Sequence, residues 1–89
     1  MLKTDFKKIV EDGHNRGKCY MVVKIETEGN PGPEIIVNPV ENFAAKVAYY
    51  DKAYNDALEL ISAKNAGKSV RITDALMTSN LNDLNWFIY

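Results

Sequence analysis

Apolar residues recur at spacings of three and four between residues 43 and 61, the longest regular pattern in the chain. This spacing is typical of one face of an α-helix. The preceding residues favour a helix start, since Asn38 is a good N-cap and Pro39 suits the first helical position. Glu41 stands where its carboxylate can reach back to the N–H of Asn38. The sequence therefore predicts one long helix from Pro39 to about Ala66, with an apolar face made of Phe43, Val47, Tyr50, Tyr54, Leu58 and Ile61.

A helix of that length would be roughly 40 Å long, because an α-helix rises about 1.5 Å per residue. This length exceeds the diameter expected for a domain of 89 residues. We therefore expect one end of the helix to project, fray or kink.

Segments on both sides of this helix alternate between apolar and polar residues, which is the period of β-strands. Residues 18–28 and 34–37 form two such strands, and the Gly- and Pro-rich residues 29–33 between them predict a wide hairpin loop. Residues 69–74 form a third strand. The first strand has a mixed face and an apolar face, and the apolar face consists of Cys19, Met21, Val23 and Ile25.

The two ends of the chain predict smaller elements. Thr4 can cap a short first helix, which Gly13 is placed to end. Residues 85–89 favour strand structure and would form a last edge strand. We therefore predict a single α+β domain over residues 1–89, in the order α-β-β-α-β with or without a final β. Its small antiparallel or mixed sheet has three to four strands and carries the long helix across one face.

The composition is that of a globular protein with little net charge. Of 89 residues, 46% are hydrophobic and 26% are charged, with 11 basic and 12 acidic side chains. The net charge of −1 argues against a strongly electropositive nucleic-acid-binding surface. We expect no secretory signal and no membrane span, because the N-terminal residues are charged and the apolar runs are short. The single cysteine excludes an internal disulfide and fits a cytoplasmic location.

The residues that carry most enzyme chemistry are few and scattered. His14 is the only histidine, and its polar turn favours a solvated loop residue. Cys19 follows Lys18, a cation that can activate a thiol, but the strand pattern places Cys19 on the apolar face as a buried, inert residue. The carboxylates show no spacing typical of acid–base catalysis or of a metal site. We therefore expect no catalytic residues, no metal, no cofactor and no enzymatic activity.

Tyr49, Ala53 and Leu60 form a second apolar strip beside the main helical face. A sheet covers one stripe of a helix, so this strip is either covered by the N-terminal helix or the C-terminal segment, or exposed as a partner surface. Trp86 and Tyr89 at the C-terminus either dock onto the core or pair with a second subunit. We take these five residues as candidates for binding a protein partner or a second copy of the chain.

Tyr20, Lys24 and Arg71 define an alternative surface on the outer face of the sheet. An aromatic ring between basic side chains is typical of platforms for single-stranded nucleic acid. Three glutamates would flank this platform, and Tyr20 would be almost its only aromatic residue, so we rank it second.

Residues 33–54, PEIIVNPVENFAAKVAYYDKAY, resemble small uncharacterised bacterial and phage proteins that have a PEIIINPxENF segment followed by paired tyrosines. The resemblance implies a small accessory protein, of phage or prophage origin, and no known activity, cofactor or catalytic residue. The function hypothesis is therefore a non-enzymatic protein-interaction or regulatory module, and the alternative is single-stranded nucleic-acid binding. The residues that carry the resemblance are Asn38, Pro39, Glu41, Phe43, Tyr49, Tyr50 and Tyr54, all with cap or packing explanations.

Overall fold

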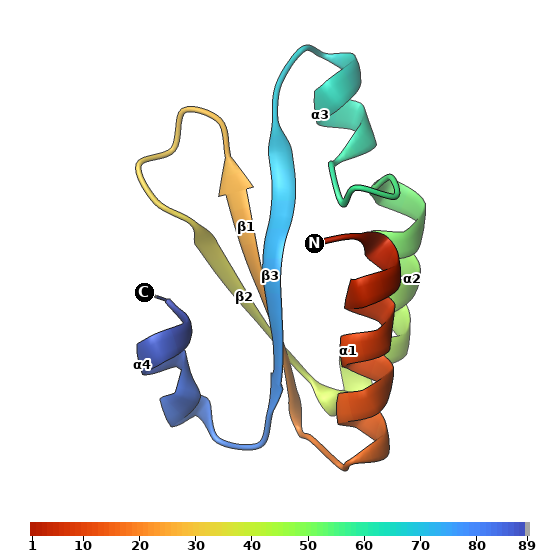
Figure 1. Ribbon diagram of the computed structural model, residues 1–89, viewed down its shortest axis with the longest axis vertical. Coiled ribbons are helices and arrows are strands. Elements are labelled where there is room, and N and C mark those ends of the chain that lie inside the picture. Colours follow the sequence, from red (N-terminus) through yellow and green to blue (C-terminus); the bar gives the residue numbers. More distant parts are fainter. Residues whose placement is uncertain (89) are drawn as a thin grey trace.

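The computed structural model describes residues 1–88 and shows three layers (Figure 1). A three-stranded antiparallel sheet has two helices on one face and a short C-terminal helix on the other. The α+β class and the order of elements that the sequence predicts are confirmed. The helices are α1 (Lys3–Asn15), α2 (Phe43–Ala53), α3 (Ile61–Asn65) and α4 (Leu84–Phe87), the strands are β1 (Tyr20–Thr27), β2 (Glu34–Pro39) and β3 (Val70–Thr78), and 3-10 turns occupy η1 (Val40–Asn42) and η2 (Leu81–Asp83).

Strand β1 lies at the centre of the sheet, in the order β2-β1-β3. The hairpin loop between β1 and β2 is wide, as its prolines predict. The strand β3 is longer than expected and pairs Thr78 with Tyr20. The register shifts between Lys24 and Ile25, which leaves one extra residue on β3 and keeps Ile72 opposite Ile25. This bulge allows both halves of β3 to turn apolar side chains towards the helices.

The main core lies between the sheet and the helices α1 and α2. The predicted inner face of β1 is confirmed for Met21, Val23 and Ile25, which are buried. Phe6 of α1 meets Tyr50 of α2 above them, with ring centroids 5.5 Å apart and the rings nearly perpendicular. The remaining buried apolar residues of this core are Val10, Phe43, Tyr54, Leu58 and Ile72.

The outer face of the sheet carries a second, smaller apolar contact. Val22 points to this face and is fully buried, and Phe87 of α4 is 3% exposed. The Lys24 Nζ lies 4.8 Å from the centroid of the Phe87 ring.

The predicted last edge strand is wrong, because Leu84–Phe87 form the helix α4. Hydrogen bonds in the turn before α4 favour a helix start: the Thr78 hydroxyl donates to the Asp83 carboxylate at 2.6 Å, and the Asn82 N–H donates to the Asn80 side chain.

The predicted long helix is also wrong, at both ends. Asn38 and Pro39 belong to β2, since Pro39 is extended (φ −71°, ψ 163°), and α2 begins only at Phe43. The helix ends at Ala53, and Tyr54 is extended again. A straight helix of roughly 40 Å would exceed the longest extent of the molecule, 38 Å. Glu41 lies in the 3-10 turn and caps no helix from Asn38.

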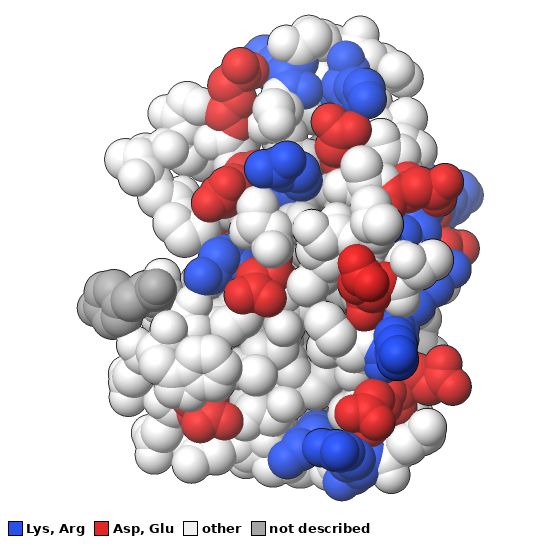
Figure 2. All heavy atoms as spheres, viewed as in Figure 1, with Lys and Arg blue, Asp and Glu red and all other residues white. Residues whose placement is uncertain are grey.

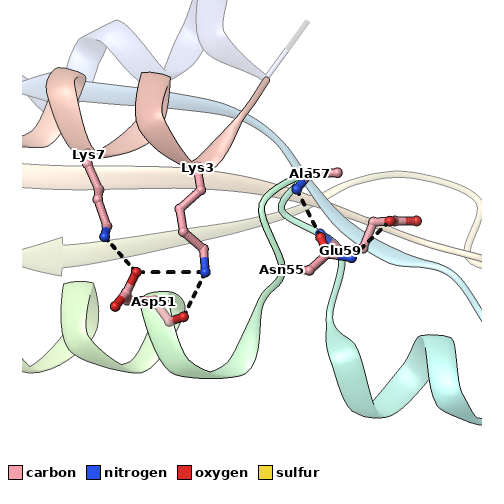
Figure 3. Close-up of polar contacts among 6 residues, drawn as sticks. All are labelled: Lys3, Lys7, Asp51, Asn55, Ala57 and Glu59. Atoms are coloured by element: carbon pink, nitrogen blue, oxygen red, sulfur yellow. Dashed lines mark hydrogen bonds and ion pairs between the residues drawn. The ribbon is translucent and has the colours of Figure 1, made fainter.

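A compact turn at Asn55 ends α2 (Figure 3). The Asn55 Oδ1 accepts hydrogen bonds from the N–H groups of Ala57 and Glu59 at 3.0 and 2.9 Å. Its Nδ2 donates to the Glu59 carboxylate at 3.1 Å. Leu58 takes a left-handed conformation (φ 59°) inside this turn and is fully buried. Asn55 thus gives the backbone a set of hydrogen bonds that replaces helical ones.

The first helix differs from its expected limits by a few residues. It begins at Lys3, and the Asp5 carboxylate accepts from the Leu2 N–H at 3.0 Å, so Thr4 is not the cap. It continues through Gly13, its predicted end, because Gly17 (φ 74°) supplies the left-handed residue four positions later. No helix within residues 1–88 is long and apolar enough to cross a membrane.

Replacing Gly13 with alanine should destabilise the protein. A Cβ at this position would lie against the Met77 Cβ and 2.5 Å from its Cγ, so α1 and β3 would have to separate. The overpacking should cost about 1–3 kcal/mol, more than the ~1 kcal/mol that alanine contributes to helix propensity. Urea unfolding measures the difference. Gly32→Ala is the matched control, since nothing lies within 4 Å of its Cβ. Equal stability of the two variants would contradict the close helix–strand contact.

Replacing Asn55 with alanine should lower the free energy of unfolding by about 1–3 kcal/mol, because two backbone N–H groups lose their acceptor. Asn85→Ala, on the exposed side of α4, should change it by less than about 0.5 kcal/mol. Thermal or urea unfolding followed by circular dichroism compares the two. Equal stability and equal helix content in the two variants would contradict the role of the Asn55 side chain in ending α2.

Candidate protein-interaction surface

A shallow apolar groove of about 610 Å³ lies between α2 and α3. We call it the Tyr49 groove. Tyr49 and Ala53 line it from α2, and Leu60 and Ile61 line it from the start of α3. The structure therefore brings together the three residues of the predicted apolar strip, across two elements and not along one helix. The remaining lining residues are Lys52, Ser62 and Asn65.

Tyr49 is held in place by other tyrosines although it is 50% exposed. Its ring lies 5.5 Å from that of Tyr50 and 6.4 Å from that of Tyr54, edge to face in both cases. Tyr50 and Tyr54 are themselves buried against the core. Tyr49 thus presents one face of an anchored ring to solvent, which is the exposed alternative that the sequence left open.

Leu60 is fixed from the other side of the groove by backbone pairing. It forms an isolated antiparallel bridge with Tyr54, and its N–H donates to the Val70 carbonyl at 2.8 Å. The Ile72 N–H donates to the Leu58 carbonyl at 3.0 Å, which continues the pairing along β3. The wall that carries Leu60 and Ile61 is therefore joined to the sheet.

The N-terminal helix does not cover the groove, because it contacts the opposite side of α2 (Figure 3). Lys7 forms an ion pair with Asp51 at 2.6 Å, and Lys3 donates to the Asp51 carbonyl at 2.8 Å. The hydrogen bond from Lys7 and its charge hold the pKa of Asp51 below the usual range. On an α-helix, residue 51 lies about 200° from residue 49, so α1 and the groove occupy opposite sides of α2.

Lysines border the groove. The Lys46 Nζ lies 5.7 Å from the centroid of the Tyr49 ring, and Lys52 is one of the lining residues. Lys64 pairs with Glu59 at 3.0 Å nearby. The groove therefore combines an apolar floor with a basic rim.

Burial affects the pKa of both inner tyrosines in the same direction. Burial raises the pKa of Tyr54 to about 12, with smaller contributions from the neighbouring tyrosines and Glu34. It also raises the pKa of Tyr50, against the opposing effect of the Asn38 amide. The Tyr50 hydroxyl and the Asn38 Nδ2 are both buried and lie close enough to interact, but no hydrogen bond of good geometry satisfies either group. The aromatic cluster beneath Tyr49 is thus uncharged over the physiological range.

Trp86 is separate from the Tyr49 groove. It is 61% exposed on α4, which lies on the other face of the sheet (Figure 1). Its ring stands edge-on to that of the buried Phe87, with centroids 6.1 Å apart. Tyr89, the other candidate at the C-terminus, lies outside the described residues.

Tyr20, Lys24 and Arg71 do not form one continuous platform. Tyr20 pairs with Thr78 at one end of β1, whereas Arg71 pairs with Glu26 towards the other end. Lys24 lies between them, with its Nζ over the Phe87 ring. On the view in Figure 2, basic and acidic side chains alternate over the surface without a large patch of one sign. This arrangement differs from the basic, aromatic-lined grooves in which proteins bind single-stranded nucleic acid.

His14 is exposed, as expected, but it lies in a helix and not in a loop, and Cys19 differs from its expected environment altogether. His14 lies in the last turn of α1, with its ring edge-on to Phe43 at 5.7 Å. Cys19 is exposed and not buried, because β1 begins one residue later and the sheet does not cover it. Within residues 1–88, no group of three or more His, Cys, Asp or Glu side chains is arranged to hold a metal ion.

Sequence reasoning missed two groups of groove residues. Helical spacing predicts Ile61 on the core stripe, but the break at Asn55 turns it outward, and it is 40% exposed. Lys46 and Lys52 were not singled out at all. The Asn55-Asp56 pair was the available signal, since such residues often leave a helix to bind their own backbone.

Comparisons of the chain with protein-family models, with curated proteins and with solved structures find no match.

The protein should lose stability as the pH rises from about 10 towards 12, and Tyr54→Phe should weaken that dependence. The folded-state pKa of Tyr54 is raised above its unfolded value, so the folded protein holds the proton longer and unfolding becomes easier as the pH passes through this window. The slope per group is at most about 1.4 kcal/mol per pH unit. Urea unfolding of both proteins between pH 9 and about 11.5 measures the effect. Parallel stability curves would contradict the burial of the Tyr54 hydroxyl.

Proposed function

We propose that this protein is a non-enzymatic protein-interaction module, and that the Tyr49 groove is its binding site. The observation that carries the proposal is the position of Tyr49, an anchored ring with half its surface free. A rigid aromatic side chain at the edge of an apolar groove loses little conformational entropy on binding. Such residues dominate the energetics of protein interfaces.

The rim of the groove defines the chemistry of its partner. Lys46 and Lys52 stand beside an apolar floor made by Tyr49, Ala53 and Leu60. An apolar segment with carboxylates next to its anchor side chains would match both features, and its charge would speed the encounter. The occupant that we propose is therefore an acidic-flanked apolar segment of a second protein.

The size of the groove agrees with such a segment. Its volume of about 610 Å³ accommodates a few side chains and no large domain face. The groove is open along one side, since Tyr49 and Ile61 both remain half exposed. A short helix or an extended peptide fits this geometry, as in other helix-in-groove interactions.

Selection of displayed random peptides against the purified protein tests the proposal. We expect enriched peptides with two or three large apolar residues and at least one adjacent Asp or Glu. Tyr49→Glu should weaken the binding of an enriched peptide by tenfold or more (order of magnitude), because it replaces the anchor with a charge of the wrong sign. Fluorescence anisotropy or calorimetry measures the affinity.

The matched control is Trp86→Glu, which adds the same charge at an exposed aromatic residue on the other face of the sheet. It should leave the affinity unchanged. Equal losses in both variants, or no enrichment of peptides, would overturn the groove as the binding site. Salt-dependent binding of a single-stranded oligonucleotide, lost in Arg71→Glu and kept in Tyr49→Glu, would support the nucleic-acid alternative instead.

A further inference from the structure

Strand β2 has a free edge. It pairs with β1 on one side, and no backbone group of another described element pairs with it on the other. Its sequence is EIIVNP, with the charged Glu34 and Pro39 at its two ends, so that residues 35–37 at its centre have no charge, proline or bulge to protect the edge. Val37 is 38% exposed on it. An apolar, regular edge of this kind is a template for a further strand.

The terminal proline shows which backbone groups face outward. Pro39 has no N–H, so its pair with Tyr20 must be of the non-hydrogen-bonded type. The two types of pair alternate along an antiparallel ladder, so the pairs that involve Ile35 and Val37 are also non-hydrogen-bonded. Their N–H and C=O groups therefore point away from β1, towards the free edge.

The prolines that flank β2 are placed symmetrically about Ile36. Pro33 and Pro39 each lie three residues from it. If a second β2 pairs antiparallel with Ile36 at the centre, Ile35 of each copy stands opposite Val37 of the other copy, which gives two such pairs. Each of these two pairs can exchange two hydrogen bonds. A shift of two residues in either direction would set a proline ring against a carbonyl of Ile35 or Val37, so the prolines select one register.

The side chains in that register are also complementary. Ile36 lies opposite the partner's Ile36, and no like charges meet, because Glu34 falls opposite the partner's Asn38. Asn38 is only 3% exposed, and its Nδ2 has no hydrogen-bond partner within the described chain. Glu34 is exposed and lies on the same face of the strand, since residues two apart point the same way. The partner's Glu34 would supply the acceptor that Asn38 lacks.

We propose that two copies of this chain pair through β2 about a twofold axis at Ile36, which forms a continuous six-stranded antiparallel sheet. This pairing uses no residue of the Tyr49 groove and does not depend on the function proposed for it. The interface is isologous, as in most homodimers. A strand pair alone buries a small area, so the dimer exchanges reversibly with the monomer.

Sedimentation equilibrium over a range of concentrations tests the dimer. We expect a species of twice the monomer mass at high concentration, which dissociates on dilution. Val37→Pro removes one outward N–H from each copy and should raise the dissociation constant by roughly thirtyfold, since two hydrogen bonds are lost. If this variant does not fold by circular dichroism, Val37→Lys tests the same edge, because an edge lysine opposes strand addition. Val40→Lys, 43% exposed but beyond Pro39, is the control and should leave the dissociation constant unchanged.

A cross-link tests the register. In a Cys19→Ser background, Ile36→Cys should oxidise to a covalent dimer, because opposite residues in a non-hydrogen-bonded pair have Cα atoms about 4.5 Å apart, within disulfide range. Val37→Cys should cross-link more slowly, since residue 37 faces the partner's residue 35. Glu34→Ala should weaken the dimer and Glu28→Ala, in the hairpin loop, should not. A strict monomer at all concentrations, a dimer indifferent to the Val37 variants, or faster cross-linking at residue 37 would overturn the proposal.

Discussion

The burial of β1 on both faces is the constraint on which the architecture depends. Met21, Val22 and Val23 are consecutive and all fully buried. Neighbouring residues of a strand point to opposite faces, so neither face of the central strand can be left to water. Helices α1 and α2 cover one face and α4 covers part of the other (Figure 1). The edge of β2 and the outer side of α2 are not covered in this way.

A local competition at Asn55 decides the shape of the outer side of α2. The apolar spacing continues beyond Tyr54, and a helix that followed it would place Ile61 on the buried stripe. The Asn55 side chain instead binds two backbone N–H groups, and the buried, left-handed Leu58 reverses the chain. The segment that follows pairs with β3 and returns beside Tyr49. The groove exists because the helix stops there.

The two proposed surfaces would act together without sharing residues. We propose a segment of another protein for the Tyr49 groove and a second copy of the same chain for the edge of β2. A twofold dimer carries two grooves in a fixed arrangement. If a partner carries two such segments, its second segment would bind at an effective concentration set by the distance between the grooves. Its apparent affinity for the dimer would then exceed that of one segment for one groove.

Much of the burial pattern could be predicted from the sequence. Alternation identified the inner face of β1, and helical spacing identified Phe43, Tyr50, Tyr54 and Leu58 as core residues, all of which are buried. Tyr49, Ala53 and Leu60 were also identified as a second strip, either covered or exposed; Tyr49 is exposed, whereas Ala53 and Leu60 pack partly against the core. These conclusions hold because apolar side chains leave water whatever backbone path brings them together.

The sequence by itself determined the α+β class, the order of the elements and most of the residues that are buried. Only the tertiary structure decided where α2 ends, that Trp86 and Phe87 lie in a helix on the outer face of the sheet, and that Cys19 is exposed. The hydrogen bond from Ile72 to Leu58 and the contact of Phe87 with Lys24 join residues far apart in the chain, and they add to local preferences of a few tenths of a kcal/mol per residue (order of magnitude). The spacing of apolar residues predicts which side chains are buried, but it does not predict whether the helix between them is continuous.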